Sequence, residues 1–392
     1  MSVGVSYEQL PWTSRVAREH LPRRERANLE RPYVAAIPHP IRDLQLLLPD
    51  SMVERVVEAQ EQIIRFDTEV GHITAPFGSI LLRSESASSS QIENLTSSAH
   101  AIAEAEINER NDGNAALIVA NVRAMEAAVA AADDLSDTAI IRMHEELLGR
   151  TDPAITGRYR DQQVWIGGGN FTPHDAAFIP PHYDRVPRAM HDLIVYARRP
   201  SPIPLASIAV AHAQFETVHP FPDGNGRTGR ALVQASLRRS GLTKSVTVPV
   251  SAGILQQRDT YFTALTAFRS GEVAPIIDVF VDGTFLAIAN GRQLVADIEQ
   301  TTREWAESLR AIRSDAAAHR IAGLAVEHPV LNSQLVRTEV RGSDPALFRG
   351  LDQLVEHGVL TETTSRSRNR IWVATAIIEN LDAFARRSMR RR

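Results

Sequence analysis

The twelve residues from His219 to Arg230 constrain the fold of this chain more than any other stretch of its sequence. Apolar residues at spacings of three and four run through 205–218 and reach His219, where Pro220 stops the helix. A second helical pattern follows at 227–239. The stretch therefore has to fold as a short turn between two helices, with a histidine held at the end of the first.

The turn combines residue types that bind phosphate groups. Backbone N–H groups of a glycine-rich turn at a helix N-terminus converge on one point and favour an anion there. Two arginines, three residues apart, lie in the same first turn, where the helix dipole disfavours cations unless an anion lies between them. Gly229 lowers the stability of the helix by about 1 kcal/mol relative to alanine. We interpret this cost, like the two arginines, as a sign of a bound anion. The predicted phosphate-binding residues are Gly224, Asn225, Gly226, Arg227 and Arg230.

The composition excludes several other chemistries. The chain has no cysteine, which excludes a disulfide framework, a thiolate metal site and a cysteine nucleophile. Hydrophobic residues make up 43% and charged residues 23%, proportions that exclude a disordered or collagen-like chain. The N-terminus lacks a basic region followed by an apolar run, and Asp278 and Asp282 interrupt the apolar stretch 276–289. We therefore expect a cytoplasmic protein that does not enter a membrane.

Apolar periodicity predicts a mostly α-helical chain. The first fifty residues contain six prolines and should be extended or turn-like. Within the Gly/Pro-rich interval 149–187, two short apolar segments at 162–166 and 176–179 predict a β-hairpin. The expected helices are 52–66, one that starts near Ser90, 99–106, 115–133, 137–148, 190–198, 205–218, 227–239, 251–269 and 273–306.

The C-terminal region differs from the rest of the chain in charge. Residues 313–392 hold 13 arginines against 9 acidic residues, so this region carries a net +4 and the preceding residues carry −8. Its pattern is three helices, at 316–326, 332–340 and 345–357, followed by two strands, which predicts a winged helix-turn-helix. The strands are expected at 360–364 and 370–373, and the residues that would contact phosphates of DNA are Arg366, Arg368, Arg370 and the arginines of 386–392.

The turn from His219 to Arg230 resembles, position for position, the active-site motif of the Fic (filamentation induced by cAMP) family, His-x-Phe-x-Asp/Glu-Gly-Asn-Gly-Arg-x-x-Arg. Residues 157–160, 164–167, 180–181 and 211–216 also resemble the surrounding Fic core. The first 125 residues look like the N-terminal domain often found with it. The resemblance implies a helical core with a β-hairpin flap, and the transfer of AMP from ATP to a Ser, Thr or Tyr hydroxyl of a target protein or of the chain itself.

The chemistry of this transfer suits the residue types of the turn. His219 can take the hydroxyl proton as general base, because a histidine pKa lies near working pH. Asp223 offers a hard oxygen ligand to Mg²⁺ bound to the phosphates of ATP. The amides of 224–226 and the Asn225 side chain would hold phosphate oxygens, and the two arginines would neutralise the β- and γ-phosphates. Phe221 is expected to pack inward.

The remaining candidate residues lie outside the turn. The flap, formed by Val164, Trp165 and Ile166, would pair with an extended segment of the target by strand addition. Tyr261 stands where many relatives of the family have paired tyrosines near the nucleotide, so the resemblance makes it an ATP contact. No cysteine or carboxylate set accompanies His212 or His144, and we interpret both histidines as core residues.

A second motif lies upstream of the turn. Ser89-Ser90-Gln91-Ile92-Glu93-Asn94 resembles the inhibitory motif of the family, Ser/Thr-x-x-x-Glu-Gly/Asn. In the family this glutamate reaches the second arginine of the active-site motif, here Arg230, and occupies the space that the γ-phosphate needs. Ser90 and Glu93 are also spaced as a capping box at a helix start, and the two interpretations are compatible. The predicted inhibitory residues are Ser89, Glu93 and Asn94.

We therefore predict three domains: an N-terminal domain at 1–125 with the inhibitory motif at 89–94, a Fic core at 126–300, and a winged helix at 301–392. Two alternatives stay open. The same fold can remove AMP or transfer another phosphoryl group, or the chain can be a DNA-binding regulator that acts through its C-terminal region. A homodimer is compatible with the sequence.

Overall fold

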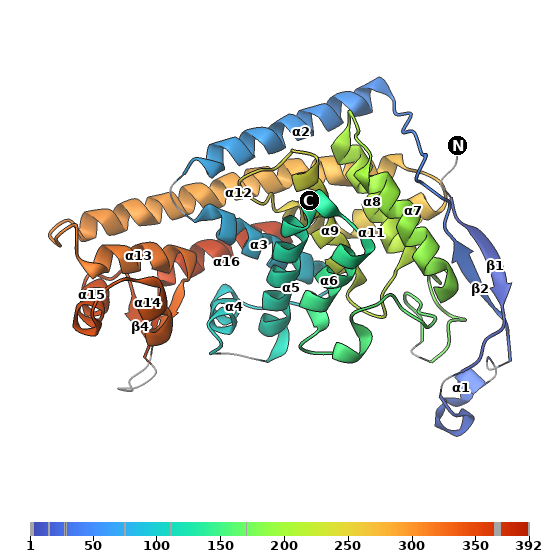
Figure 1. Cartoon of the computed structure of the whole chain (residues 1–392), viewed down its shortest axis with the longest axis horizontal. Coiled ribbons are helices and arrows are strands. Elements are labelled where there is room, and N and C mark those ends of the chain that lie inside the picture. Colours follow the sequence, from blue (N-terminus) through green and yellow to red (C-terminus); the bar gives the residue numbers. More distant parts are fainter. Residues whose placement is uncertain are drawn as a thin grey trace. The chain divides into compact units, whose positions relative to one another are not determined.

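The computed structural model describes residues 4–14, 16–26, 28, 30–73, 76–109, 112–169, 171–363 and 370–390. Figure 1 shows that helices dominate these residues. The chain divides into two compact units. Unit 1 comprises Met1–Val57, Ala124–Ser240 and Asp259–Val281, and unit 2 comprises Glu58–Arg123, Gly241–Arg258 and Asp282–Arg392.

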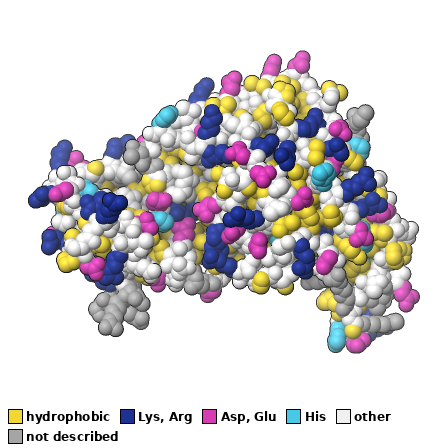
Figure 2. All heavy atoms as spheres, in the orientation of Figure 1, with side chains coloured by type: hydrophobic (Ala, Val, Ile, Leu, Met, Phe, Trp, Pro, Cys, Tyr) yellow, Lys and Arg dark blue, Asp and Glu magenta, His cyan; other side chains and the backbone are white. Residues whose placement is uncertain are grey.

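Three long helices each continue from one unit into the other: α2 (Asp50–Gly71), α5 (Gly113–Ala130) and α12 (Ala274–Ser308). The boundaries predicted near residues 125 and 300 fall inside α5 and α12. Compact units and functional domains need not coincide, so the division into three domains stays a prediction. Figure 2 shows basic and acidic side chains interspersed over the visible face, as the small net charge of −4 leads one to expect.

Unit 1 contains an N-terminal β-hairpin and a group of helices. The strands β1 (Ser6–Leu10) and β2 (Tyr33–Ile37) pair antiparallel, with Ser6 opposite Ile37. The helices are α1 (Arg23–Arg26), α6 (Asp137–Leu148), α7 (Val186–Arg198), α8 (Pro204–Val218), α9 (Asn225–Arg239) and α11 (Arg258–Arg269), with 3-10 turns η1 (Arg18–His20), η2 (Ala132–Asp134), η3 (Pro153–Ile155) and η4 (Tyr183–Arg185).

Helix α8 is the core helix of unit 1. Pro204 lies in its first turn, where a missing N–H costs nothing, and 13 of its 15 residues are buried. It packs against both α7 and α9. A Cβ at Gly229 in α9 would lie 2.9 Å from Cδ1 of Phe215 in α8, so this glycine permits the close approach of the two helices. Helix packing alone therefore accounts for Gly229, without a bound polyphosphate.

Unit 2 contains further helices and a small sheet. In the sheet, β5 (Ile371–Val373) lies between β3 (Val330–Asn332) and β4 (Thr361–Glu362), and both pairs are antiparallel. The helices are α3 (Phe77–Ile92), α4 (Ala99–Glu106), α10 (Val250–Gln256), α13 (Ala317–Glu327), α14 (Ser333–Glu339), α15 (Asp344–Glu356) and α16 (Thr375–Met389).

Helix α3 differs most from the sequence prediction. We expected a helix to start near Ser90, whereas α3 ends at Ile92 and Glu93 is its C-terminal cap. The interpretation of Ser90 and Glu93 as an N-terminal capping box is therefore wrong. Serine is only a moderate helix former, but 12 of the 16 residues of α3 are buried, and tertiary packing overrides the weak local preference.

Most other helices lie where periodicity predicts them. The helices expected at 99–106 and 137–148 are confirmed to the residue as α4 and α6. The helix expected at 251–269 is interrupted at Gln257 and forms α10 and α11. Helix α16 was not expected. The predicted hairpin at 162–179 is reduced to a single antiparallel bridge between Ile166 and Phe178.

The C-terminal residues follow the order α13, β3, α14, α15, β4 and β5 that a winged helix requires, and assignment to that class stays a prediction. Arg366 and Arg368 lie outside the described residues. Arg370 pairs with Glu362 and Asp352 at 2.6 and 3.2 Å, so two carboxylates neutralise it. The guanidinium group of Arg387 donates to Asn290 and to Asp297, so it is also engaged within the unit.

Helix α12 is long and apolar enough to cross a membrane by length and composition alone. Its most apolar window has a mean hydropathy of 1.3, and 61% of that window is buried. The core helix of a soluble protein passes the same test, so this helix does not decide the location of the protein.

Candidate active site

His219 occupies a strained position at the end of α8. It is the C-terminal cap of the helix, and its N–H donates to Phe215 O at 2.8 Å. Its φ of 51° lies in the left-handed region, which a residue with a Cβ adopts only at a cost of about 1–2 kcal/mol. The turn thereby directs the chain away from the axis of α8 at the histidine itself.

Buried Arg160 holds this turn in place. Its Nε donates to His219 O at 2.8 Å, and its Nη2 donates to Pro181 O at 2.6 Å. Its Nη1 donates to Gln162 O and its backbone N–H donates to Pro220 O, both at 2.9 Å. Burial lowers the pKa of Arg160 to about 10, which still leaves it charged near neutral pH. The sequence resemblance includes Arg160, but no role was predicted for it.

The surroundings of His219 favour its neutral form. Burial, and then the positive charges of Arg160 and Arg269, lower the pKa of His219 to about 3. Nδ1 of His219 lies 4.0 Å from Oε2 of Glu216, one helical turn earlier. The imidazole therefore stays unprotonated near neutral pH, and its lone pair remains available. Sequence reasoning missed both Glu216 and Arg269, and only their place beside the histidine in the fold reveals them.

The loop after His219 is held by contacts of Phe221 and Asn225 and by His144 of α6. The ring of Phe221 is fully buried and stacks on His144 at 3.8 Å. His144 also bonds Asp223 O through Nε2 at 3.0 Å. Asn225 accepts from Phe221 N and donates to Phe221 O, each at 2.8 Å. The inward packing of Phe221 and the core role of His144 are confirmed, and the Asn225 side chain shapes the loop instead of pointing to a phosphate.

Gly224 starts α9 in a conformation that suits glycine. Its φ is 73°, and an added Cβ would lie 3.0 Å from Leu147 and 3.1 Å from Leu148. Gly224 offers no side-chain cap, and Asn225 and Gly226 form the first turn of α9. The N–H groups of a first turn have no acceptor within their own helix. This helix N-terminus is therefore shaped for an anion, as the sequence predicts.

The two arginines of the turn are almost fully buried, with Arg227 3% and Arg230 2% exposed. Nη2 of Arg227 lies 3.7 Å from Oδ2 of Asp223, whose side chain is 68% exposed. Within the described residues, no group of three or more His, Cys, Asp or Glu side chains could hold a metal ion. A single exposed carboxylate suits Mg²⁺, which proteins commonly bind through one or two carboxylates together with substrate phosphates and water.

The flap residues lie on the same unit as the turn. Ile166 N donates to Phe178 O at 2.8 Å, and Ala36 N of β2 donates to Ile179 O at 3.0 Å. β2 therefore bonds the flap segment that ends at Ile179, and on the other segment Trp165 packs against Trp12 at a ring-centroid distance of 5.7 Å. The guanidinium group of Arg269 lies 3.8 Å over the ring of Phe178 and joins the flap to α11.

Tyr261, which the resemblance makes an ATP contact, is buried against His212 in this structure. It is 1% exposed, and its hydroxyl lies 2.8 Å from Nε2 of His212. The next residue, Phe262, is 45% exposed, because successive residues of a helix point about 100° apart. The core role of His212 is confirmed. The assignment of Tyr261 as an ATP contact stays a prediction, and Phe262 is the more exposed of the two aromatic residues.

The residues of the upstream motif lie in unit 2. Ser89 and Ser90 are fully buried, and Asn121 donates to Ser90 Oγ at 3.3 Å. Glu93 caps α3, and Asn94 follows with φ 63°, the left-handed conformation in which glycine and asparagine commonly end a helix. The pairing of Glu93 with Arg230 joins residues of different units and stays a prediction.

Comparison with known proteins agrees with these features. Residues 134–237 match the Fic/DOC family model. Protein adenylyltransferase fic-1 of Caenorhabditis elegans is 34% identical over 148 residues, which are 37% of this chain and 26% of that protein. Protein adenylyltransferase Fic of Drosophila melanogaster is 29% identical over 195 residues, which are 48% of this chain and 37% of that protein. The chain thus spans between about a quarter and two fifths of the length of these curated relatives.

A solved structure shares the fold over most of the chain. The crystal structure of a Fic family protein from Desulfovibrio desulfuricans G20 superposes with a TM-score of 0.53 and 24% identity, covering 84% of this chain and 97% of that one. This chain therefore shares its helical fold with that protein. Residues 134–237 are a Fic domain.

Proposed function

We propose that the protein is an adenylyltransferase that moves AMP from ATP to a hydroxyl group of a target protein. The observation that supports this most is the pairing of a neutral, fixed histidine with an anion-binding helix start six residues later in the chain. One supplies a base and the other holds phosphates. The matched relatives carry the name protein adenylyltransferase.

His219 acts as the base in this proposal. A neutral imidazole accepts the proton of the target hydroxyl as the oxygen attacks the α-phosphorus of ATP. The new bond joins this oxygen to the α-phosphorus, the bond from the α-phosphorus to the bridging oxygen breaks, and pyrophosphate leaves with the electron pair. Nδ1 faces Glu216 at 4.0 Å, so Nε2 is the nitrogen left for the substrate. Arg160 keeps the imidazole in place through the backbone of residue 219.

The start of α9 stabilises the leaving group. The N–H groups of its first turn and the guanidinium groups of Arg227 and Arg230 offer positive charge to the phosphates. Asp223 would hold a magnesium ion, which supplies further positive charge to the phosphates when it is bound. The Asn225 side chain takes no direct part, because both of its polar atoms bond Phe221.

The flap positions the target. Strand addition to the edge at 164–166 would hold an extended segment with its hydroxyl near His219. The opposite side of the hairpin is already occupied by β2. The target would therefore add at 164–166, and a segment that is already folded into a helix would not fit.

Glu93 acts as a brake in this proposal, through an ion pair with Arg230 that displaces the γ-phosphate. Three features support it: the match to the inhibitory motif, the place of Glu93 at the C-terminal end of α3, and the left-handed Asn94 that turns the chain directly after it. A charged Arg–carboxylate pair is strong enough to compete with a phosphate contact.

Transfer of label from ATP tests the reaction. With the label on the α-phosphate, the Glu93→Gly protein should label itself or proteins of a lysate, and Glu93→Gly, His219→Ala should not. ATP labelled on the γ-phosphate is the control for phosphorylation, and should leave no label. Undiminished α-label transfer by the His219→Ala form would refute the mechanism.

A separate measurement isolates the brake. Glu93→Gly should tighten ATP binding and raise labelling, whereas Glu93→Gln keeps the size of the side chain and removes only its charge. Equal labelling by the unchanged protein and by Glu93→Gly would leave Glu93 as a helix cap alone. Release of AMP from a labelled target by the unchanged protein would favour AMP removal, the alternative reaction of this fold.

DNA binding through the C-terminal region receives less support. Arg370 and Arg387, two of its predicted contacts, already bond carboxylates of the same unit. A salt-dependent gel shift with the full chain would nevertheless establish it.

A further inference from the structure

Unit 1 contains a polar cavity at the opposite end of α8 from His219. Its volume is about 330 Å³, and its lining comes from the C-terminal ends of α7 and α9 and from the first turns of α8. The 15 residues of α8 separate this end from the active-site turn by about 22 Å. None of the site residues predicted from the sequence lines the cavity.

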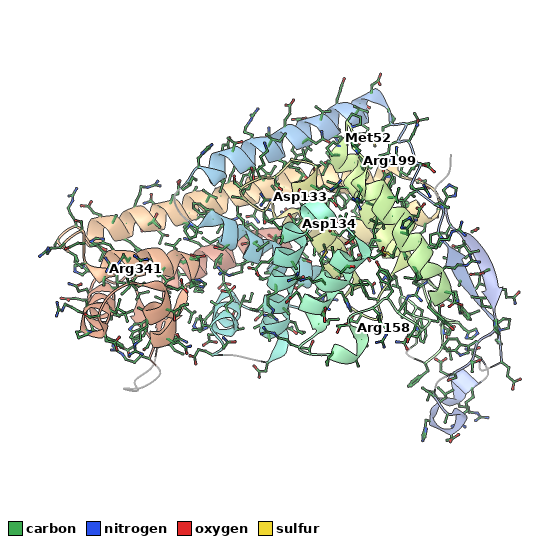
Figure 3. The ribbon with its side chains drawn as sticks, in the orientation of Figure 1. Met52, Asp133, Asp134, Arg158, Arg199 and Arg341 are labelled. Atoms are coloured by element: carbon green, nitrogen blue, oxygen red, sulfur yellow. The ribbon has the colours of Figure 1, made fainter. Side chains whose placement is uncertain are left out.

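The lining is positively charged. Three arginines, Arg198, Arg199 and Arg239, face one acidic residue, Asp133. Figure 3 labels Arg199 and Asp133. Arg239 donates to the backbone oxygens of Asp133 and Arg198, and Arg199 donates to the backbone oxygen of Arg42 at 2.6 Å. These bonds orient the guanidinium groups without neutralising them, and in the described part of the chain none of the three arginines pairs with a carboxylate.

The start of α8 adds further attraction for an anion. Ile203 precedes the helix and offers no side-chain cap, and Pro204 occupies its first turn. Ser207 donates to Ser201 Oγ at 2.8 Å, and both serines line the cavity. The N–H groups of Ile203, Ala206 and Ser207 already have acceptors in the chain, so the helix dipole is what favours a negatively charged group at this end of the cavity.

A buried hydroxyl in the same cavity points to a ligand independently of these charges. Tyr196 is 5% exposed, and its hydroxyl is buried beside Ser207, whose own hydroxyl donates to Ser201. Burial raises its pKa, so it stays protonated and remains a donor. Leaving such a group unsatisfied costs about 1–3 kcal/mol, and a ligand oxygen would satisfy it.

We propose that this cavity binds a small phosphate-bearing ligand no larger than a mononucleotide. Arginine forks, a helix N-terminus and hydroxyl donors together are the groups that bind phosphate in proteins. The volume lies at the lower end of the range of small-molecule sites, about 300–1,000 Å³, which suits a ligand of this size. The site is separate from the active-site turn and does not depend on the proposed transfer reaction.

Hydrogen exchange with pyrophosphate as the probe tests the proposal, because it reports each region separately. Pyrophosphate should slow exchange in peptides that cover 196–208, in addition to any protection at 221–230. Citrate, which carries carboxylates instead of phosphates, should protect 196–208 less at the same concentration. Protection at 221–230 alone would overturn the proposal, and equal protection by citrate would overturn its preference for phosphate.

Variants of the lining then link the protection to the cavity. Tyr196→Phe and Arg198→Gln should each raise the pyrophosphate concentration for half-maximal protection of 196–208 about tenfold. Arg188→Gln changes an exposed arginine of the same helix α7 outside the cavity, and should leave that concentration unchanged. Exchange at 221–230 serves as the folding control for all three variants. Equal half-maximal concentrations in the cavity variants and in Arg188→Gln would overturn the assignment.

Discussion

His219 in unit 1 and Glu93 in unit 2 both stand at the C-terminal end of a helix, beside a left-handed residue. At the end of α8 the left-handed residue is His219 itself, with φ 51°. At the end of α3 it is Asn94, the residue after Glu93, with φ 63°. The strain therefore falls on the candidate base in one unit, and on a neighbour that tolerates it in the other.

The partners of the two turns differ in the same way. The turn at His219 is held by Arg160, which is buried and bonds three backbone oxygens at distances of 2.9 Å or less. The turn at Asn94 is bonded by a half-buried arginine, Arg258, through one hydrogen bond to the Asn94 side chain at 2.9 Å. Strained conformations persist only where the surroundings hold them firmly. The comparison indicates that the turn at His219 is held firmly, which suits a base. The turn after Glu93 is held less firmly, which suits a brake.

Loss of the arginine clamp should have the largest effect. Arg160→Gln removes the donors to His219 O and Pro181 O and should lower kcat about 100-fold, because a small displacement of the base is costly. The KM for ATP should change little, because Arg160 lies outside the phosphate-binding turn. Initial rates of AMP transfer measure both constants, and thermal unfolding reports any loss of stability.

The matched control for the clamp is Arg158→Gln, which changes an exposed arginine two residues away, labelled in Figure 3. It should retain nearly full activity. An equal loss of kcat in both variants would remove the special role of Arg160, and so would a rise in KM without a fall in kcat.

The pH profile should show the next largest effect. A histidine with the ordinary pKa of about 6.5 would be about nine-tenths protonated at pH 5.5 and correspondingly inactive as a base. The lowered pKa of His219 keeps the imidazole neutral at this pH. The value of kcat/KM at pH 5.5 should therefore be about tenfold higher than for a base with a pKa of 6.5. An acidic limb centred near 6.5 would contradict the environment described for His219.

Acid stability is the control for this profile. The pKa of His219 is lower in the folded than in the unfolded chain, so the unfolded chain binds more protons between about pH 6.5 and 3. The contribution of the neutral imidazole to stability is therefore present above pH 6.5 and falls as the pH drops toward 3. Enzyme held at pH 5.5 and assayed at pH 7.5 separates this loss from the titration of the base.

The backbone strain at residue 219 should appear as a difference in the free energy of unfolding between two inactive variants. Asparagine adopts the left-handed conformation more readily than alanine, so His219→Asn should be more stable than His219→Ala by about 1 kcal/mol. Urea unfolding measures the difference. Equal stability would mean that the turn relaxes once the histidine is removed.

The corresponding pair at residue 94 should show the smallest effect. Asn94→Gly should change the free energy of unfolding by only a few tenths of a kcal/mol, whereas Asn94→Ala should lower it by about 0.5–1 kcal/mol. The end of α3 can fray locally, which limits the loss. A larger difference at residue 94 than at residue 219 would reverse the comparison of the two turns.

Much of the site could be predicted because its signals are local. The helix stop at Pro220, the glycine start of α9 and the two arginines all lie within twelve residues, and their placement in the fold agrees with the prediction. The inward packing of Phe221 also follows from the local pattern. Asn94 carried an equally local signal, since asparagine after a helix favours a C-terminal cap, but the spacing of Ser90 and Glu93 favoured a helix start instead.

The missed features depend on partners far away in the sequence. Arg160 bonds residues 59 and 21 positions away, and Tyr261 meets a histidine 49 positions away. Helix α3 is helical because unit 2 buries its serines. Glu85 in α3, for example, accepts from the backbone and the hydroxyl of Ser251.

The sequence by itself determined the helical character of the chain, the position of the active-site turn and the chemistry of its residues, because spacing and residue type act within one or two helical turns. Only the tertiary structure decided which groups hold His219, which of Tyr261 and Phe262 is the more exposed, and where α3 ends. Burial decides these points, since it sets the cost of an unpaired donor, a strained φ or a charged imidazole, and residues distant in the sequence supply that burial.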